Sequence, residues 1–388
     1  MNQTSRRKIE QLRICAEEEV ETREDCFADV KLVHVALPEI DKDEIDLNTE
    51  FLGFSFDYPV MIASMTGGHP ATKRTNKVLA KAAESLGVGM GVGSQRAALE
   101  SSEQEDSFRV VRDVAPNSFI YANLGAPQLK EYGIEGVERV IEMIDADAIA
   151  IHLNFLQEAI QPEGNVDASG CLASIKDVCE AIKKPVIVKE TGAGISYWVA
   201  KKLHEAGVSA IDVGGLGGTS LAAAEIYRAR AEGAELGEHL GNLFGWDWGI
   251  TTLESIVECS ALPFSIPVIA TGGIRNGLDI AKSMALGADL CSAALPFLKP
   301  AMGNANADAD VDADADIDAD AEKVTEKIKE MGEELKVAMF LTGCKSTTEL
   351  KEAEVIITGK AKEIAEQRGV IERLKRKKRQ SGSQMRLK

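Results

Sequence analysis

Eight short apolar runs recur at regular intervals between residues 59 and 291, and they limit what this chain can fold into. Stretches with a helical pattern lie between them, for example residues 75–86, 134–144 and 173–182. Short continuous apolar strands that alternate with helices are typical of a parallel sheet buried on both faces. Eight such units in roughly 230 residues predict an α/β fold, a (β/α)₈ TIM barrel. The predicted strands are residues 59–63, 88–92, 119–122, 148–151, 185–188, 210–213, 267–270 and 288–291.

A doubly wound sheet is the competing fold, but no Gly-x-Gly-x-x-Gly motif follows the first strand. We expect residues 1–50, which are polar and have a helical pattern over 5–18, to form an N-terminal arm. Residues 51–388 would then form the barrel domain, in which the Gly-rich stretch 231–248 is a candidate lid or oligomer contact.

Beyond the eighth strand, residues 304–321 alternate Asp with Ala and offer no core-forming side chains. Because such a segment repels itself, we expect a disordered acidic insert, with helices at 322–340 and 347–354 after it. The loop glycine and terminal Glu of a calcium-binding hand are missing from the insert, which argues against a calcium site. Residues 373–388 read as a basic, solvated tail.

The composition excludes several classes of protein. The formal net charge is −18, so a nucleic-acid partner is not expected. No apolar run approaches the ~18 residues of a membrane span, and the first residues lack the apolar core of a signal peptide, so we expect no membrane partner and a cytoplasmic location. The seven cysteines form no Cys-x-x-Cys pair, which predicts reduced thiols and no zinc site.

Polar side chains follow the fourth strand at once. His152, Asn154, Gln157 and Glu158 come within seven positions, and Gln161 follows. At the carboxyl-end mouth of a barrel, where such folds keep their chemistry, this cluster could hold an anion and a divalent metal, with Gln157 bonded to a reacting atom. The alternative is a polar loop that caps a helix.

Two glycine loops, residues 214–220 and 271–277, leave late strands and precede helices. Backbone amides can approach a phosphate there, because no Cβ intervenes. Lys189 ends a central strand and needs an anionic partner, which could be a reduced flavin, although a Schiff-base lysine and a paired structural lysine are alternatives. Thr66, Ser94 and Asn123 could bond the edges of a flavin ring.

The donors at the mouth exceed what one cofactor phosphate requires. A substrate diphosphate held against Mg²⁺ on Glu158 would use the surplus. The residues that would hold this second anion are Arg7, Lys8, Ser94, Gln95, Arg96, His152 and Asn154.

Taken together, these motifs resemble those of type 2 isopentenyl-diphosphate isomerases. The resemblance runs from Arg7 to at least Leu295 and resumes at residues 341–344. The motifs that carry it are MTGG (65–68), GSQR (93–96), NLG (123–125), HLNFLQE (152–158), QPEG (161–164), VKE (188–190), GGLGGT (214–219) and GGIR (272–275).

The resemblance implies interconversion of isopentenyl and dimethylallyl diphosphates with FMN and Mg²⁺. It implies that NADPH serves to reduce the flavin, that N5 of the reduced flavin moves the proton, and that the reaction has no net redox change. It further implies a soluble homo-oligomer, a tetramer or octamer. Two alternatives stay open at this point: an FMN-dependent 2-hydroxyacid oxidase, disfavoured because the late loops carry no His, and a non-catalytic barrel that binds a phosphorylated ligand.

Carried over residue by residue, the family pattern implies a role for each position. Gln157 is the catalytic residue that assists proton transfer, and Glu158 binds Mg²⁺. The residues that would contact the substrate are Arg7, Lys8, Ser94, Gln95, Arg96, His152, Asn154 and Gln157. Those that would hold FMN are Met65, Thr66, Ser94, Asn123, Lys189, Thr219, Gly273, Arg275, Ala294 and Leu295.

Overall fold

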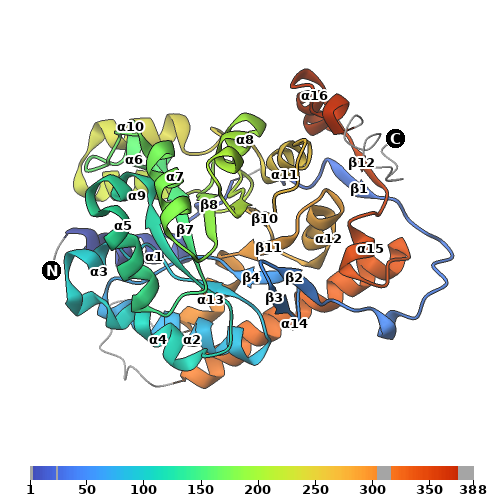
Figure 1. Ribbon diagram of the computed structural model, residues 1–388, viewed down its shortest axis with the longest axis horizontal. Coiled ribbons are helices and arrows are strands. Elements are labelled where there is room, and N and C mark those ends of the chain that lie inside the picture. Colours follow the sequence, from blue (N-terminus) through green and yellow to red (C-terminus); the bar gives the residue numbers. More distant parts are fainter. Residues whose placement is uncertain (1–2, 23–24, 304–315, 375–388) are drawn as a thin grey trace.

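The eight predicted strands close into one parallel barrel in the computed structural model, which describes residues 3–22, 25–303 and 316–374 (Figure 1). All eight strand predictions are confirmed. The strands follow one another in chain order, and β11 closes the barrel by pairing with β4 through Cys291 and Val60. Their bounds are β4 Val60–Ile62, β5 Met90–Gly91, β6 Ile120–Gly125, β7 Ala148–Leu153, β8 Val186–Glu190, β9 Ala210–Asp212, β10 Val268–Thr271 and β11 Leu290–Ala293.

Helices surround the barrel, and their ends follow from local sequence. Helix α9 begins after Ser220, whose side chain accepts a hydrogen bond from Ala223 N, and it ends at Gly233, which has a φ of 69°. A capping box joins Thr251 and Glu254 at the start of α11. The helices between β4 and β11 are α2 Lys73–Ser85, α3 Arg96–Glu100, α4 Asp106–Val114, α5 Ala126–Met143, α6 Phe155–Ile160, α7 Cys171–Ala181, α8 Tyr197–Glu205, α9 Leu221–Glu232, α10 Glu235–Phe244, α11 Thr252–Ser260 and α12 Gly277–Ala285.

A hairpin closes the amino-terminal end of the barrel. Strands β2 (Thr49–Phe51) and β3 (Phe54–Phe56) pair antiparallel, and Phe51 and Phe56 pack among the inward-facing residues of the barrel strands. The ring of Phe119 lies edge-on to that of Phe56, with 5.7 Å between ring centroids. Since this end is filled by aromatic side chains, the carboxyl end is the one left open to ligands.

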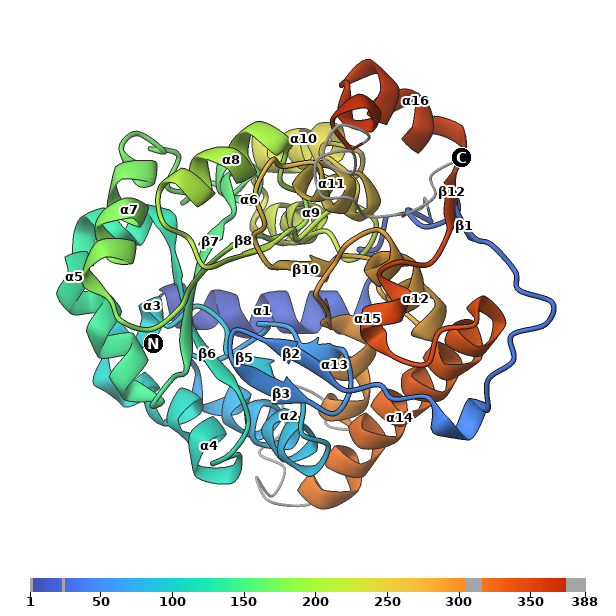
Figure 2. The same cartoon turned by 45° about the vertical axis from the view of Figure 1, so that its right-hand side comes forward.

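Helix α1 (Gln3–Glu17) belongs to the predicted N-terminal arm and packs across the opposite end of the barrel. Figure 2 shows α1 behind the barrel when the β2–β3 hairpin faces the viewer. Cys15 and Val20 pack with Ala224 of α9 and with Leu295 and Leu298 of α13 (Leu295–Met302). The first residues of the chain therefore cover the site end. Farther along the arm, β1 (Val30–Leu32) pairs with β12 (Val355–Ile357) near the C-terminus.

The acidic segment ends earlier than we expected. Helix α14 spans Ile317–Thr342, so its first turns include residues 317–321, which we had assigned to a disordered insert. The reason is a tertiary contact: Asp320 is buried and accepts a hydrogen bond from Arg74 Nη2 at 2.5 Å and one from Lys323 Nζ at 2.8 Å. The remainder of the predicted insert, residues 304–315, lies outside the described residues.

The C-terminal part packs on the barrel wall through α15 (Thr347–Leu350) and α16 (Gly359–Gln367). Most of the predicted basic tail, residues 375–388, lies outside the described residues. The stretch 231–248 contains α10, which packs on α9 and α6. No helix in the described ranges combines the length and the apolar character needed to cross a membrane.

Candidate active site

One large cavity opens at the carboxyl end of the barrel, between the strand ends and α1. It encloses about 1480 Å³ of empty space, part of which is open to solvent. The structure brings most of the predicted site residues together here. Those that line the cavity are Arg7, Lys8, Met65, Ser94, Arg96, Asn123, His152, Asn154, Gln157, Glu158, Lys189, Thr219, Gly273, Arg275, Ala294 and Leu295.

Two predicted site residues do not line the cavity. Gln95 is fully buried, where its Nε2 donates to Val140 O at 2.9 Å and its Oε1 accepts from Asn123 N at 3.0 Å. Both ends of this amide therefore serve the fold, and a diphosphate contact for Gln95 is not supported. Thr66 is also buried behind the wall, and its carbonyl oxygen accepts from Gly93 N at 2.8 Å.

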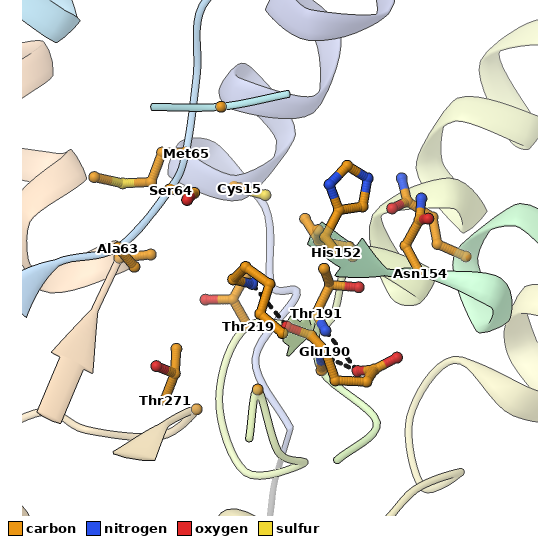
Figure 3. A pocket seen from close by; sticks show the side chains of 18 of the residues that line it. Cys15, Ala63, Ser64, Met65, His152, Asn154, Glu190, Thr191, Thr219 and Thr271 are labelled. Carbon is orange, nitrogen blue, oxygen red and sulfur yellow. Dashed lines mark hydrogen bonds between the residues drawn. The ribbon is translucent and has the colours of Figure 1, made fainter. Parts of the chain in front are cut away.

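The register of the barrel explains how the polar cluster assembles. His152 on β7 is the partner of Lys189 on β8, and Lys189 is the partner of Asp212 on β9. Residues paired across parallel strands point to the same side of the sheet, so these three side chains form one row. Figure 3 shows His152 and Asn154 on one side of the cavity, facing Met65 and Ser64 on the other.

The cavity has a cationic corner made by α1, α3 and β7. Arg7 and Lys8 reach it from α1 and Arg96 from α3. Burial, and then the charge of Arg7, lowers the pKa of Lys8 to about 7. Burial, followed by the charges of Lys189, Lys8 and Arg7, lowers the pKa of His152 to about 3. Buried groups that lie beside several cations favour an anionic ligand, because an anion would offset both the lost solvation and the repulsion.

His152 is held by a neighbour from the third barrel strand. Its Nδ1 lies 2.8 Å from Asn123 Oδ1, while Asn123 Nδ2 donates to Val92 O at 3.0 Å. This second bond orients the Asn123 amide, so Nδ1 of the imidazole carries the proton and Nε2 is left for a ligand. The side chain of Asn123 thus orients His152, which is a role we had not expected for it.

Glu158 is buried and braced by three donors. Its Oε1 accepts from Asn154 Nδ2 at 2.9 Å, and its Oε2 accepts from Gln161 Nε2 at 2.9 Å and from Asn165 N at 2.6 Å. Gly164 is required in the turn because a Cβ there would collide with the carbonyl oxygen of Glu158. The motif at residues 161–164 therefore serves to fix the direction of one carboxylate.

Gln157 is held by residues that sequence reasoning missed. Its Nε2 donates to Glu225 Oε1 at 2.8 Å, and Gln11 Nε2 donates to the same oxygen at 2.9 Å. The other oxygen of Glu225 accepts from Arg228 Nη1 at 2.6 Å. The sequence did contain one signal for them, since Glu225 and Arg228 lie three residues apart in the alanine-rich helix α9. Charged residues are seldom fully buried unless they are paired, so two of them within an apolar helix indicate a buried ion pair.

The floor of the cavity carries the buried charges of two strand ends. Lys189 Nζ donates to the carbonyl oxygen of Glu190 at 2.7 Å and lies beside Asp212, whose pKa burial raises. The carboxylate of Glu190 accepts from the amides of Thr191, Gly192 and Ala193 at 2.6, 2.7 and 2.5 Å. Figure 3 shows Glu190 beside Thr191. Burial raises the pKa of Glu190 to about 7, and these amides and Lys189 oppose that rise. Glu190, too, was missed by sequence reasoning.

The two glycine loops meet on the other side of the cavity. Within the described part of the chain, the amides of Gly218, Thr219, Gly273 and Ile274 donate to no protein acceptor. Gly273 has a φ of 74°, and a Cβ there would strike Gly217 O, so only glycine allows the loops to approach this closely. Unpaired amides that precede α9 and α12 form a cradle for a phosphate.

Comparisons with known proteins agree with this geometry. The family model described as FMN-dependent dehydrogenase matches residues 2–112 and 148–357. Among solved structures, the lactate oxidase of Pediococcus acidilactici covers 91% of this chain and 87% of its own, at 18% identity and a TM-score of 0.61. Flavocytochrome b2 with sulfite bound covers 88% and 81%, also at 18% identity and 0.61. The structures show the fold alone, and the fold and family model together define the class: a barrel of the FMN-dependent dehydrogenase type.

Comparison with curated relatives identifies the family within this class. The isopentenyl-diphosphate delta-isomerase of Methanosarcina mazei is 56% identical over 371 residues, which are 95% of this chain and 96% of that protein. The isopentenyl-diphosphate delta-isomerase of Archaeoglobus fulgidus is 53% identical over 366 residues, or 94% and 99%. This chain belongs to the type 2, FMN-dependent isopentenyl-diphosphate delta-isomerase family.

Proposed function

We propose that this protein interconverts isopentenyl diphosphate and dimethylallyl diphosphate with bound FMN and Mg²⁺. The observation that carries the proposal is that one cavity holds two separate groups of side chains and amides suited to anions. The unpaired amides of the glycine loops form one group, and the cations beside Glu158 form the other. One phosphorylated cofactor and one diphosphate substrate would occupy both.

The residues present fit FMN. The four unpaired amides of the glycine loops would hold its phosphate. Lys189 would stand against the ring, with Met65 and Ser64 on the wall opposite His152. Arg275 is ion-paired with Glu21 in the loop after α1, so it would contact the phosphate only by leaving or sharing that partner. Reduced FMN would supply the acid–base group that acts on the alkene, and NADPH would be its reductant.

The residues also fit a magnesium ion held against a diphosphate. The described residues contain no cluster of three or more His, Cys, Asp or Glu side chains that could bind a metal by themselves. Mg²⁺ commonly uses one carboxylate together with substrate phosphates and water. Glu158, aimed by its three donors, would be that carboxylate. Gln161 Oε1 nearby is buried without a protein partner and could accept a hydrogen bond from a water ligand.

The chain's own residues would divide the work between binding and proton transfer. Arg7, Lys8, Arg96 and His152 would bind the diphosphate, and α1, which supplies two of them, would exclude water from above. Gln157 would face the alkene. Because Glu225 accepts one N–H of this amide, the amide oxygen and the second N–H are left to guide a proton at the reacting carbon.

Three further expectations belong to this proposal. Contact between copies would use the exposed apolar side chains Leu236, Leu243 and Trp248 on and after α10, as the tetramer or octamer expected from the resemblance requires. Ser94, Ala294 and Leu295, which line the cavity, would complete the FMN site. Thr66 and Gln95 are left out of the proposed contacts, because the structure buries them outside the cavity lining.

The deciding experiment is turnover of isopentenyl diphosphate by the purified holoenzyme under anaerobic conditions, with FMN reduced by NADPH and Mg²⁺ present. Formation of dimethylallyl diphosphate, and its loss when Mg²⁺ is chelated or the flavin is left oxidised, is the expected result. A yellow protein that binds the diphosphate without isomerising it would refute the proposal and favour a binding barrel.

A further inference from the structure

Arg228 is a buried cation at a junction of three elements beside the proposed site. Its side chain is 4% exposed and contacts four carboxylates. Within α9 it pairs with Glu225 at 2.6 Å and with Glu232 at 3.6 Å. It also contacts Glu163 in the loop after α6 at 2.8 Å and Glu10 on α1 at 3.4 Å. A single guanidinium therefore ties α1 and the 161–164 loop to α9.

Three of these four contacts, those to Glu225, Glu163 and Glu10, lead to the proposed machinery. Glu225 accepts the amides of Gln157 and Gln11. The 161–164 loop carries Gln161, a donor to Glu158. Glu10 lies two residues beyond Lys8 on α1, so holding Glu10 also holds the helix that presents the diphosphate-binding cations.

The charge on Glu225 decides which end of the Gln157 amide faces the cavity. An ionised carboxylate only accepts hydrogen bonds, so Gln157 must present its N–H to Glu225 and its oxygen elsewhere. A protonated Glu225 could donate to that oxygen and turn the amide over. Arg228 Nη1 binds the other carboxylate oxygen of Glu225 at 2.6 Å, so this ion pair fixes the carboxylate with Oε1 turned toward Gln157.

We propose that Arg228 is a positioning residue for the isomerase reaction, which joins the diphosphate-binding helix α1 to the proton-transfer amide of Gln157. The proposal rests on the proposed function above. KM and kcat distinguish its two parts. The ion pairs to α1 and to the 161–164 loop affect substrate binding and therefore KM, and the ion pair to Glu225 affects the chemical step and therefore kcat.

Other titratable groups face the Arg228–Glu225 pair from α1, from the 161–164 loop and, through Glu232, from α9 itself. Burial, with Glu225 adding to it, raises the pKa of Cys15 on α1 to about 12. The hydrogen bond from Arg228 holds the pKa of Glu163 below its ordinary value, against the opposing effect of burial. Glu10 is on the partly exposed rim of the junction. Glu225 is the carboxylate sealed inside it, with a side chain 1% exposed.

Arg228→Met removes the charge and keeps an unbranched side chain, although a shorter one. We expect kcat to fall at least tenfold, because the buried carboxylate of Glu225 then has no cation beside it and no longer fixes the Gln157 amide. The double variant Arg228→Met/Glu225→Gln removes the unpaired carboxylate but keeps an acceptor for Gln157, so it should regain most of the lost kcat. A purely structural role would lower the melting temperature of both variants and give no recovery of kcat in the double variant.

Arg228→Lys keeps the charge but cannot span three elements, so it tests positioning even if the Met variant does not fold. We expect KM for isopentenyl diphosphate to rise about tenfold and kcat to stay within about threefold. The matched control is Arg230→Met on the same helix. Arg230 is 60% exposed and pairs with Glu238 on the surface, so this variant should match the wild type.

The outcomes separate the inference from the proposed function. If the wild type does not turn over isopentenyl diphosphate, the proposed function fails and the inference fails with it. If the wild type is active but Arg228→Met keeps its kcat and KM, or Arg228→Lys keeps its KM, the inference alone is overturned. Equal losses in Arg228→Met and Arg230→Met would also overturn it.

Discussion

Lys8 should take up a proton when a diphosphate binds, and its lowered pKa sets the size of the effect. In the ligand-free protein the pKa of Lys8 is about 7 instead of 10.5, because the side chain is buried beside Arg7 and Arg96. A diphosphate would replace the lost solvation and cancel the repulsion, which raises the pKa in the complex. At pH 8 about nine-tenths of the free protein carries a neutral Lys8, so binding should take up about 0.9 proton per site.

The sign of the pH dependence follows from the same shift. The charged form binds the anion, and it predominates below pH 7, so affinity should be flat there. Above pH 7 the free lysine loses its proton, and affinity should fall about 50-fold between pH 7 and pH 9, equivalent to about 2.3 kcal/mol. This holds as long as the complex keeps Lys8 charged at pH 9.

Isothermal titration calorimetry of the FMN-loaded enzyme with Mg²⁺ would measure both quantities. The ligand is isopentyl diphosphate, a saturated ester that cannot react and whose phosphates, like phosphomonoesters with a second pKa near ~6, stay ionised above pH 7. Buffers of different ionisation enthalpy report the protons taken up. Lys8→Met should abolish the uptake. If the uptake persists in Lys8→Met and disappears in His152→Gln, the imidazole is the group that charges and the reasoning for Lys8 is wrong.

Other perturbations test separate parts of the structure. Asp320→Ala removes the buried carboxylate that accepts from both Arg74 and Lys323, and it should lower the free energy of unfolding by about 3 kcal/mol, seen as an earlier urea midpoint. Deleting residues 305–315 should leave the midpoint nearly unchanged, and equal effects would contradict the helical role of Asp320. Lys189→Ala should weaken FMN binding about tenfold, measured by quenching of flavin fluorescence on titration; unchanged affinity would remove Lys189 from the flavin site. Glu158→Gln should raise the Mg²⁺ concentration needed for half-maximal turnover, and FMN should stay bound. Gln157→Leu should keep the Mg²⁺ dependence and lower kcat about 10²-fold. A shift of the Mg²⁺ dependence in Gln157→Leu would reverse the assignment of the two roles.

The strands and most of the site could be predicted because their signals are local. An apolar run such as residues 148–151 specifies a buried strand wherever it occurs, and eight of them at even spacing close a barrel. The polar residues that follow a strand then lie at the mouth, since the carboxyl ends of parallel strands share one edge. That reasoning, together with the family resemblance, placed Lys189, His152 and Glu158 in one cavity, as observed.

Packing decided which of two neighbouring residues faces the ligand. Ser94 lines the cavity while Gln95 turns into the wall, where the carbonyl of Val140 on α5 takes its amide. Nothing within the motif at residues 93–96 distinguishes the two, because both are polar and both fit an anion site. The direction of each side chain depends on the path of the loop after β5 and on the helix packed behind it.

Long-range contacts decided which charged and polar side chains pair inside the protein. They join residues that are far apart in the chain, and the sequence around one residue does not indicate its partner. Glu225 lies 68 residues from Gln157 and 214 from Gln11, yet one carboxylate oxygen accepts both amides. Asp320 reads as one more aspartate of a repulsive run, until Arg74, 246 residues away, gives it a buried partner and a place in a helix. Local composition determines whether a segment can form a strand or a helix. Only the assembled barrel determines which charges are buried together, since that depends on the low dielectric and the partners that folding brings to each site.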